Sequence, residues 1–134
     1  METPYMLIYT GNLYFLIETD RIEAVVSRQK RMSGEVPVFL LDRLCGLTGD
    51  GENEYVLLLN AGDAKFGIAV EMAEGLLNVK DTDQLFLPEE VRCRANQYLE
   101  AAVPIDREEC PAAYCVNVLE LYKKAVETEP SYWM

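Results

Sequence analysis

Histidine is absent from this chain, and its absence excludes several common kinds of active site. The Ser-His-Asp and Cys-His arrangements need an imidazole as general base, and the H-E-x-x-H zinc site needs two imidazole ligands. The glycines form neither G-x-G-x-x-G nor a loop that continues into Gly-Lys-Ser/Thr, so no phosphate-binding loop is expected. These absences favour a protein that catalyses nothing.

The four cysteines lack paired spacing, and their positions favour neither zinc nor a disulfide framework. The four residues Cys45, Cys93, Cys110 and Cys115 contain no C-x-x-C pair. The chain does not begin with a basic segment followed by an apolar one, so no secretory signal is visible and a cytoplasmic location is expected. Thiols stay reduced there. We therefore expect four free thiols that act as small apolar residues, with no metal and no cofactor.

Positive charge is also in short supply. Twelve Lys and Arg residues stand against 23 Asp and Glu, which gives a formal net charge of -11. Binders of nucleic acid or of anionic membranes need a basic surface, so neither is an expected partner. No apolar run approaches the roughly 18–20 residues of a membrane span, which argues against direct insertion. The basic cluster Arg28, Lys30 and Arg31 is either a solvated loop or a contact for an acidic partner.

The abundant carboxylates leave one alternative with chemistry, a small-molecule sensor or hydrolase. Such a protein needs a deep pocket in which carboxylates converge and have raised pKa values. Asp81 and Asp83 could share one side of an extended segment, whereas Glu89 and Glu90 are adjacent and should point apart. Pairs of this kind arise by chance in a chain with 23 acidic residues, so they do not favour catalysis.

What the chain does contain is a succession of short β-rich runs separated by turn residues. Gly11 and Asn12 stand between two such runs and signal a hairpin, because both tolerate positive φ. A second turn is expected at residues 61–63. The runs cover residues 5–10, 13–18, 22–26, 36–41, 54–60, 65–71, 75–79, 98–105 and 114–116. Many short strands with turn signals predict a mainly β barrel or sandwich.

One run has faces of unequal size. In residues 65–71, Phe66, Ile68 and Val70 share one face of the expected strand, while Gly67 and Ala69 share the other. The small face indicates that another part of the chain packs closely against it.

Two helical segments are also expected. Asp42 can cap a short turn through residues 43–45, which Gly46 then ends. Asn117 and Glu120 resemble a capping box at the start of a C-terminal helix. The apolar stripe predicted for that helix is Leu119, Tyr122, Ala125 and Val126.

The order of these segments resembles the CheW family. The run GEVPVFLLDRL, which starts at Gly34, is similar to that family's segment of apolar residues, a proline and an apolar-apolar-Asp-Leu sequence. Residues 55–60 and 66–70, with the turn between them, look like its central hairpin, and residues 116–121 look like its closing helix. The likeness extends over roughly residues 5–124 and rests on the ordered series, since no single motif is strong.

This resemblance implies both a fold and a role. The fold would be mainly β, with two small five-stranded SH3-like barrels packed together, a short helix after the fourth strand and a C-terminal helix. Residues 1–126 would form one CheW-like domain of two intertwined barrels, and residues 127–134 a flexible tail. The role would be that of a cytoplasmic, non-enzymatic adaptor that couples chemoreceptors to the histidine kinase CheA through its regulatory domain.

The resemblance also implies a groove that faces the chemoreceptor's cytoplasmic tip. Its residues here would be Ile22, Ala24, Ser33, Gly34 and Val36. For Ile22 and Val36, ordinary packing within strands is the alternative. The family commonly has a glutamate at Ala24 and an arginine at Ser33, which can pair. Because both charges are missing together, the fold should survive. A CheW-fold domain that serves another signalling partner therefore remains the alternative function.

Overall fold

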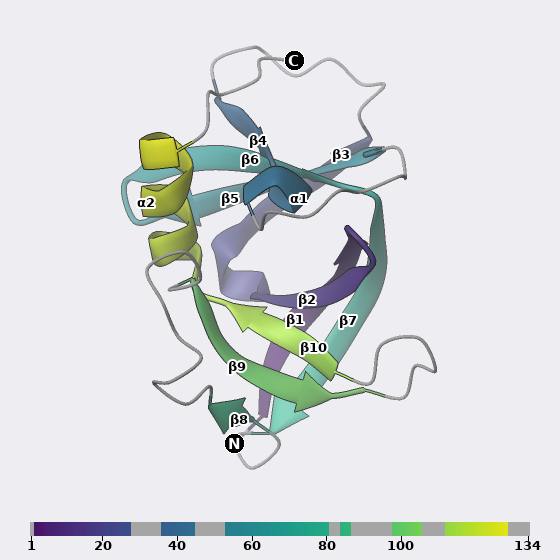
Figure 1. Ribbon diagram of the computed structural model, residues 1–134. Coiled ribbons are helices and arrows are strands. Elements are labelled where there is room, and N and C mark those ends of the chain that lie inside the picture. Colours follow the sequence, from purple (N-terminus) through teal and green to yellow (C-terminus); the bar gives the residue numbers. More distant parts are fainter. Residues whose placement is uncertain are drawn as a thin grey trace.

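Within the part of the chain that the structure describes, the regular elements are ten β-strands, two α-helices and one 3-10 turn (Figure 1). The computed structural model describes residues 2–27, 36–44, 53–80, 84–86, 98–105 and 112–128. The elements in chain order are β1 (Glu2–Thr10), β2 (Leu13–Glu18), η1 (Thr19–Arg21), β3 (Ile22–Ser27), β4 (Val38–Leu40), α1 (Leu41–Leu44), β5 (Tyr55–Ala61), β6 (Ala64–Val70), β7 (Met72–Lys80), β8 (Leu85–Phe86), β9 (Leu99–Pro104), β10 (Ala112–Val116) and α2 (Val118–Thr128).

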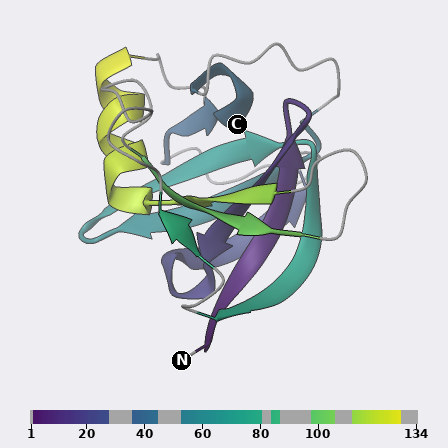
Figure 2. The same cartoon turned by 60° about the horizontal axis from the view of Figure 1, so that its bottom comes forward.

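The strands form two sheets, one above the other in Figure 1. The lower sheet has six strands in the order β7-β1-β2-β10-β9-β8, and the upper sheet has four in the order β3-β5-β6-β4. Figure 2 shows β1 and β7 running side by side along one flank of the larger sheet. The predicted mainly β class is confirmed. Among the described residues, the strands divide as six and four between the two sheets, which is consistent with the predicted pair of small barrels.

Both predicted hairpins are present, and the backbone conformation of each turn explains why glycine or asparagine occurs there. Gly11 has φ 59° and Asn12 has φ 66°, as a two-residue turn with positive φ at both positions requires. The turn joins β1 to β2 with Thr10 opposite Leu13. The second turn contains Gly62 at φ 72°, between the paired ends of β5 and β6.

The chain passes from the smaller sheet to the larger one at a single residue, Glu71. This residue separates β6 from β7, and its carboxylate Oε2 accepts a hydrogen bond of 2.7 Å from the backbone N–H of Gly11. Beside it, the buried hydroxyl of Thr10 donates to Oδ1 of Asn53 at 3.4 Å, just before β5. The turn between β1 and β2 is thus tied to the residue that links the two sheets and to the segment that leads into β5 of the smaller sheet.

A shared hydrophobic core lies between the two sheets and both α-helices. It contains buried side chains from β1 and β2 of the larger sheet, from β5 and β6 of the smaller one, and from α1 and α2. Its largest members include Phe15, Phe66, Ile17, Leu57 and Leu121. The larger sheet has a second core on its other face, and the smaller sheet has a cluster of Val38, Val56 and Ala69.

The close approach predicted at Gly67 is confirmed. β4 runs parallel to β6 with Val38 opposite Gly67, and the N–H of Gly67 donates to the carbonyl of Pro37 at 2.8 Å. A Cβ atom at Gly67 would lie 3.0 Å from Cγ1 of Val56 and 3.2 Å from Cγ2 of Val38. Phe66, Ile68 and Val70, on the opposite face, are fully buried in the shared core, as the alternation predicted.

Both helices differ in detail from the sequence-based prediction. α1 begins at Leu41, so Asp42 lies inside its first turn rather than at the cap. On α2 the residues that enter the core are Val118, Leu121 and Ala125. The predicted stripe was wrong at Leu119 and Val126, which are 40% and 56% exposed. The real stripe has the same helical spacing, rotated by one residue.

The C-terminal helix extends past the predicted boundary at residue 126. α2 continues to Thr128, and residues 129–134 of the predicted tail lie outside the described ranges. Gly46, predicted to end α1, lies outside them as well.

Candidate functional site

The residues of the predicted receptor-facing groove lie on two different strands or beside them. Ile22 and Ala24 belong to β3, and Val36 precedes β4. These two strands occupy opposite ends of the smaller sheet, with β5 and β6 between them. Ser33 and Gly34 lie outside the described residues. The sheet order therefore does not make Val36 a strand neighbour of Ile22 or Ala24, and the groove stays a prediction.

β3 nevertheless presents side chains at an open edge of the smaller sheet. Among the described residues it pairs with β5 alone, with a bulge between Ile22 and Ala24. Ile22 is half-buried and packs against the shared core, which favours the packing alternative for this residue. The exposed side chains of β3 are Glu23, which pairs with Lys65 at 3.2 Å, and Val25.

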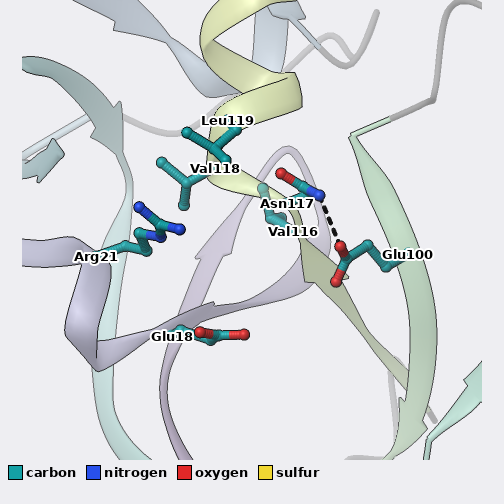
Figure 3. Close-up of a pocket in the computed structure, with 7 residues that line it drawn as sticks. All are labelled: Glu18, Arg21, Glu100, Val116, Asn117, Val118 and Leu119. Atoms are coloured by element: carbon teal, nitrogen blue, oxygen red, sulfur yellow. Dashed lines mark hydrogen bonds between the residues drawn. The ribbon is translucent and has the colours of Figure 1, made fainter. Parts of the chain in front are cut away.

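A pocket of about 140 Å³ lies at the N-terminal end of α2, where the two sheets meet (Figure 3). Its walls come from the end of β2, the 3-10 turn η1, β9, the end of β10 and the first turn of α2. The lining residues are Glu18, Arg21, Glu100, Val116, Asn117, Val118 and Leu119. We refer to it below as the α2 pocket.

Asn117 organises one wall of the α2 pocket. Its Oδ1 accepts the backbone N–H of Glu120 at 3.1 Å, which is the helix cap that the sequence predicts. Its Nδ2 donates to Oε1 of Glu100 at 2.7 Å and so positions that carboxylate. The return bond of a capping box is not made by Glu120, because the backbone N–H of Asn117 donates instead to the carbonyl of Tyr98 at 2.6 Å.

The other charged walls are formed by Glu18 and Arg21. Both follow from the path of the chain: β2 ends at Glu18, and η1 then carries Arg21 into β3. In Figure 3 the Arg21 guanidinium points toward the space between Glu18 and the first turn of α2. It makes no hydrogen bond or ion pair with any residue in the described part of the chain. The α2 pocket thus contains two carboxylates and one guanidinium.

The same two carboxylates influence a buried thiol beneath the larger sheet. Burial is the main cause that raises the pKa of Cys115 to about 11, and the negative charges of Glu100 and Glu18 add to it. A hydrogen bond from the Tyr5 hydroxyl acts in the opposite direction, and burial raises the pKa of Tyr5 as well. Cys115 is free and buried, as predicted for a small apolar residue. Cys45, Cys93 and Cys110 lie outside the described residues.

Most of the α2 pocket could not be found from the sequence. Asn117 carried a signal, its capping pattern, but nothing marked Glu18, Arg21 or Glu100. Glu18 and Arg21 lie roughly 80 residues before Glu100 in the chain, and they meet it only through the pairing of β10 with β2 and with β9. The acidic pairs noted in the sequence, Asp81 with Asp83 and Glu89 with Glu90, lie outside the described residues.

Within the residues that the structure describes, no group of three or more Cys, Asp or Glu side chains is arranged to hold a metal ion. No helix there has the length and the apolar composition needed to cross a membrane.

Comparison with known proteins gives a structural match without a sequence match. No family model matches the chain, and no curated protein matches it in sequence. The fold is similar to that of the scaffolding protein TtCheW from Thermoanaerobacter tengcongensis, with a TM-score of 0.73 and 11% sequence identity. The alignment covers 92% of this chain and 94% of that one. The chain therefore has the CheW fold, as the order of its segments predicted.

Proposed function

We propose that this chain is a non-enzymatic adaptor in chemotaxis signalling that couples chemoreceptors to the kinase CheA. The observation that carries the proposal is the likeness to a scaffolding protein over nearly the full length of both chains. An inserted catalytic domain would leave a large unmatched segment, and the coverage leaves little room for one. The absence of histidine from the sequence supports the non-enzymatic part, because the common acid–base and nucleophilic arrangements depend on it.

Adaptor proteins act through their outer surfaces, and two features of this fold suit that task. β3 ends the smaller sheet with its outer edge open among the described residues, and open strand edges are common sites of protein recognition. The ties from Glu71 and Thr10 hold the two sheets in one arrangement, so that a partner contacting both sheets would meet a preformed surface.

A second function is favoured by one specific observation. Ala24 lies on β3 without a charge, at the position where the family commonly has a glutamate, and Ser33 takes the place of the arginine. The charge on β3 is instead at Glu23, and it is paired with Lys65. The alternative is a CheW-fold domain that binds a signalling partner other than the chemoreceptor and CheA.

Calorimetric titration of the folded chain separates these functions. The adaptor proposal expects binding to the CheA regulatory domain, and a CheW protein serves as the positive control. No heat of binding at about 100 μM, where a weak signalling contact should still register, would contradict it. Binding to CheA without binding to a chemoreceptor tip would retain the kinase half of the proposal and reject the coupling half.

Restoring the missing charge pair sharpens the test of receptor binding. If the groove includes these positions, the double variant Ala24→Glu/Ser33→Arg should bind the chemoreceptor tip more tightly than the sum of the single variants predicts. The matched control is Glu23→Ala, which changes charge on the same strand outside the predicted groove. Additive effects would show that the two positions do not act together in receptor binding.

A further inference from the structure

The α2 pocket contains charges of both signs that do not neutralise each other. Arg21 and Glu18 make no hydrogen bond or ion pair with the residues that the structure describes, although both are half-buried. Glu100 is bonded to the Asn117 amide, which is uncharged. Charged groups that lose hydration without gaining a partner are costly, so a molecule that supplies the opposite charges would be stabilised there.

The two signs are found on different walls. Figure 3 shows Glu100 on the β9 side and Arg21 on the η1 side, with Glu18 below and the start of α2 above. The first turn of α2 adds to the positive wall, since the N–H groups of Val118 and Leu119 have no acceptor within the helix. The Glu120 N–H is already taken by Asn117.

This arrangement disfavours a ligand with one charge alone. An anion drawn to Arg21 would also face the carboxylates of Glu18 and Glu100. A cation drawn to those carboxylates would face Arg21 and the positive end of α2. Like charges that line one small pocket repel where water is partly excluded, so the pocket discriminates against an ion of either sign. A dipolar molecule satisfies both walls at once.

Size restricts the ligand further. The pocket volume of about 140 Å³ is well below the roughly 300–1,000 Å³ that drug-sized molecules and cofactors occupy. We propose that the α2 pocket binds a small zwitterion with one carboxylate and one ammonium group, of which a free α-amino acid is the simplest. The carboxylate would face Arg21 and the start of α2, and the ammonium group would face Glu18 and Glu100. This inference is independent of the adaptor role.

Thermal unfolding of the full chain with glycine and L-alanine tests the proposal. A ligand that binds the folded state alone raises the unfolding midpoint in a saturable way. Acetate and methylammonium, at matched ionic strength, carry the same two charges on separate molecules. We expect a saturable shift with the amino acids below about 50 mM, since millimolar affinity is realistic for so small a ligand. No saturable shift, or an equal shift with acetate, would overturn the proposal.

Variants identify the pocket as the site. Arg21→Gln should weaken glycine binding by about tenfold or more, since a hydrogen-bonded charge is lost. Glu18→Gln, on the opposite wall, should weaken it as well and serves as the second test if Arg21→Gln does not fold. Lys65→Gln, an exposed cation on β6, is the matched control and should leave binding unchanged. Unchanged binding in the folded pocket variants would exclude this pocket as the site.

Discussion

Gly67 is a position where the size of one side chain decides how two strands meet. Its Cβ position is closer to Val56 and Val38 than nearly all real contacts allow. We therefore expect Gly67→Ala to reduce the free energy of unfolding by about 1–3 kcal/mol through overpacking. Urea denaturation followed by circular dichroism would measure the loss.

The control for this prediction is Gly62, where a Cβ would meet open space but φ is 72°. Gly62→Ala should be destabilising through the backbone alone, and Gly62→Asn should recover part of the loss, because Asn tolerates the left-handed region. If Val38→Ala does not relieve Gly67→Ala in a double variant, overpacking against β4 is not the cause.

Cys115 predicts a dependence of stability on alkaline pH. Burial raises its pKa to about 11 in the folded chain, above the ordinary value of 9.0. A raised folded-state pKa contributes stability that is fully present below pH 9 and is lost as the pH rises from about 9 to 11. Cys115→Ala should remove this contribution, so the wild type should lose more stability than the variant across that window.

The same pKa gives a chemical test of the folded thiol. Because Cys115 is buried and protonated near pH 8, iodoacetamide should modify it in the unfolded chain far faster than in the folded one. Mass spectrometry of the digested protein would locate the modification. Rapid alkylation of Cys115 in native buffer would show that the strand carrying it opens readily.

At the level of elements, α2 shows that the spacing of apolar residues does not by itself identify the buried face of a helix. Leu119 and Val126 satisfy a helical repeat, and so do Val118, Leu121 and Ala125. Apolar residues stand side by side at positions 118–119, 121–122 and 125–126, so the spacing alone fits either of two overlapping stripes. Contact with β5 and α1 selects the second set, which is buried in the shared core. Periodicity thus predicted the helix and the burial of Tyr122 and Ala125 correctly, but it wrongly placed Leu119 and Val126 on the buried face.

Paired alanine substitutions on α2 test this face. Leu121→Ala should reduce the free energy of unfolding by about 2–5 kcal/mol, because Leu121 is fully buried and the change leaves a cavity. Leu119→Ala, at the 40% exposed position two residues earlier, should change it by about 0.5 kcal/mol or less. Equal losses at the two positions would contradict the observed register of α2.

Strand pairing shows the same limit of sequence-based reasoning. Both two-residue hairpins were predictable, since their turn residues are local and require positive φ. The parallel pairs β4 with β6 and β10 with β2 were not, because nothing local marks which distant strands will meet. The first pairing adds β4 to the end of the smaller sheet, and the second joins β10 to β2 and so brings Glu18 close to Glu100 and the start of α2.

For the whole molecule, the shared core predicts that the two sheets unfold together. Phe66 from the smaller sheet packs 5.0 Å from the ring of Tyr122 on α2 and belongs to the same cluster as Phe15 from the larger one. Phe66→Ala should cost about 3–5 kcal/mol and accelerate amide exchange in both sheets.

Hydrogen exchange with mass spectrometry can follow the hairpins β1–β2 and β5–β6 separately. Val126→Ala, at an exposed position on α2, is the control and should leave both exchange rates unchanged. Retained protection of β1–β2 in Phe66→Ala, with loss of protection in β5–β6, would show that the sheets are independent units.

The sequence by itself determined most local features of this protein: its strands other than β8, its two tight hairpins, the crowded position at Gly67 and the cap at Asn117. Each depends on residues that lie within a few positions of one another, and their order was enough to predict the CheW fold. Tertiary structure alone decided the division into six and four strands, the buried face of α2 and the charged pocket at its base. These features arise where segments that are distant in the sequence pack together. The free energy that selects one packing arrangement over another depends on contacts throughout the core, so no local sequence pattern can predict it.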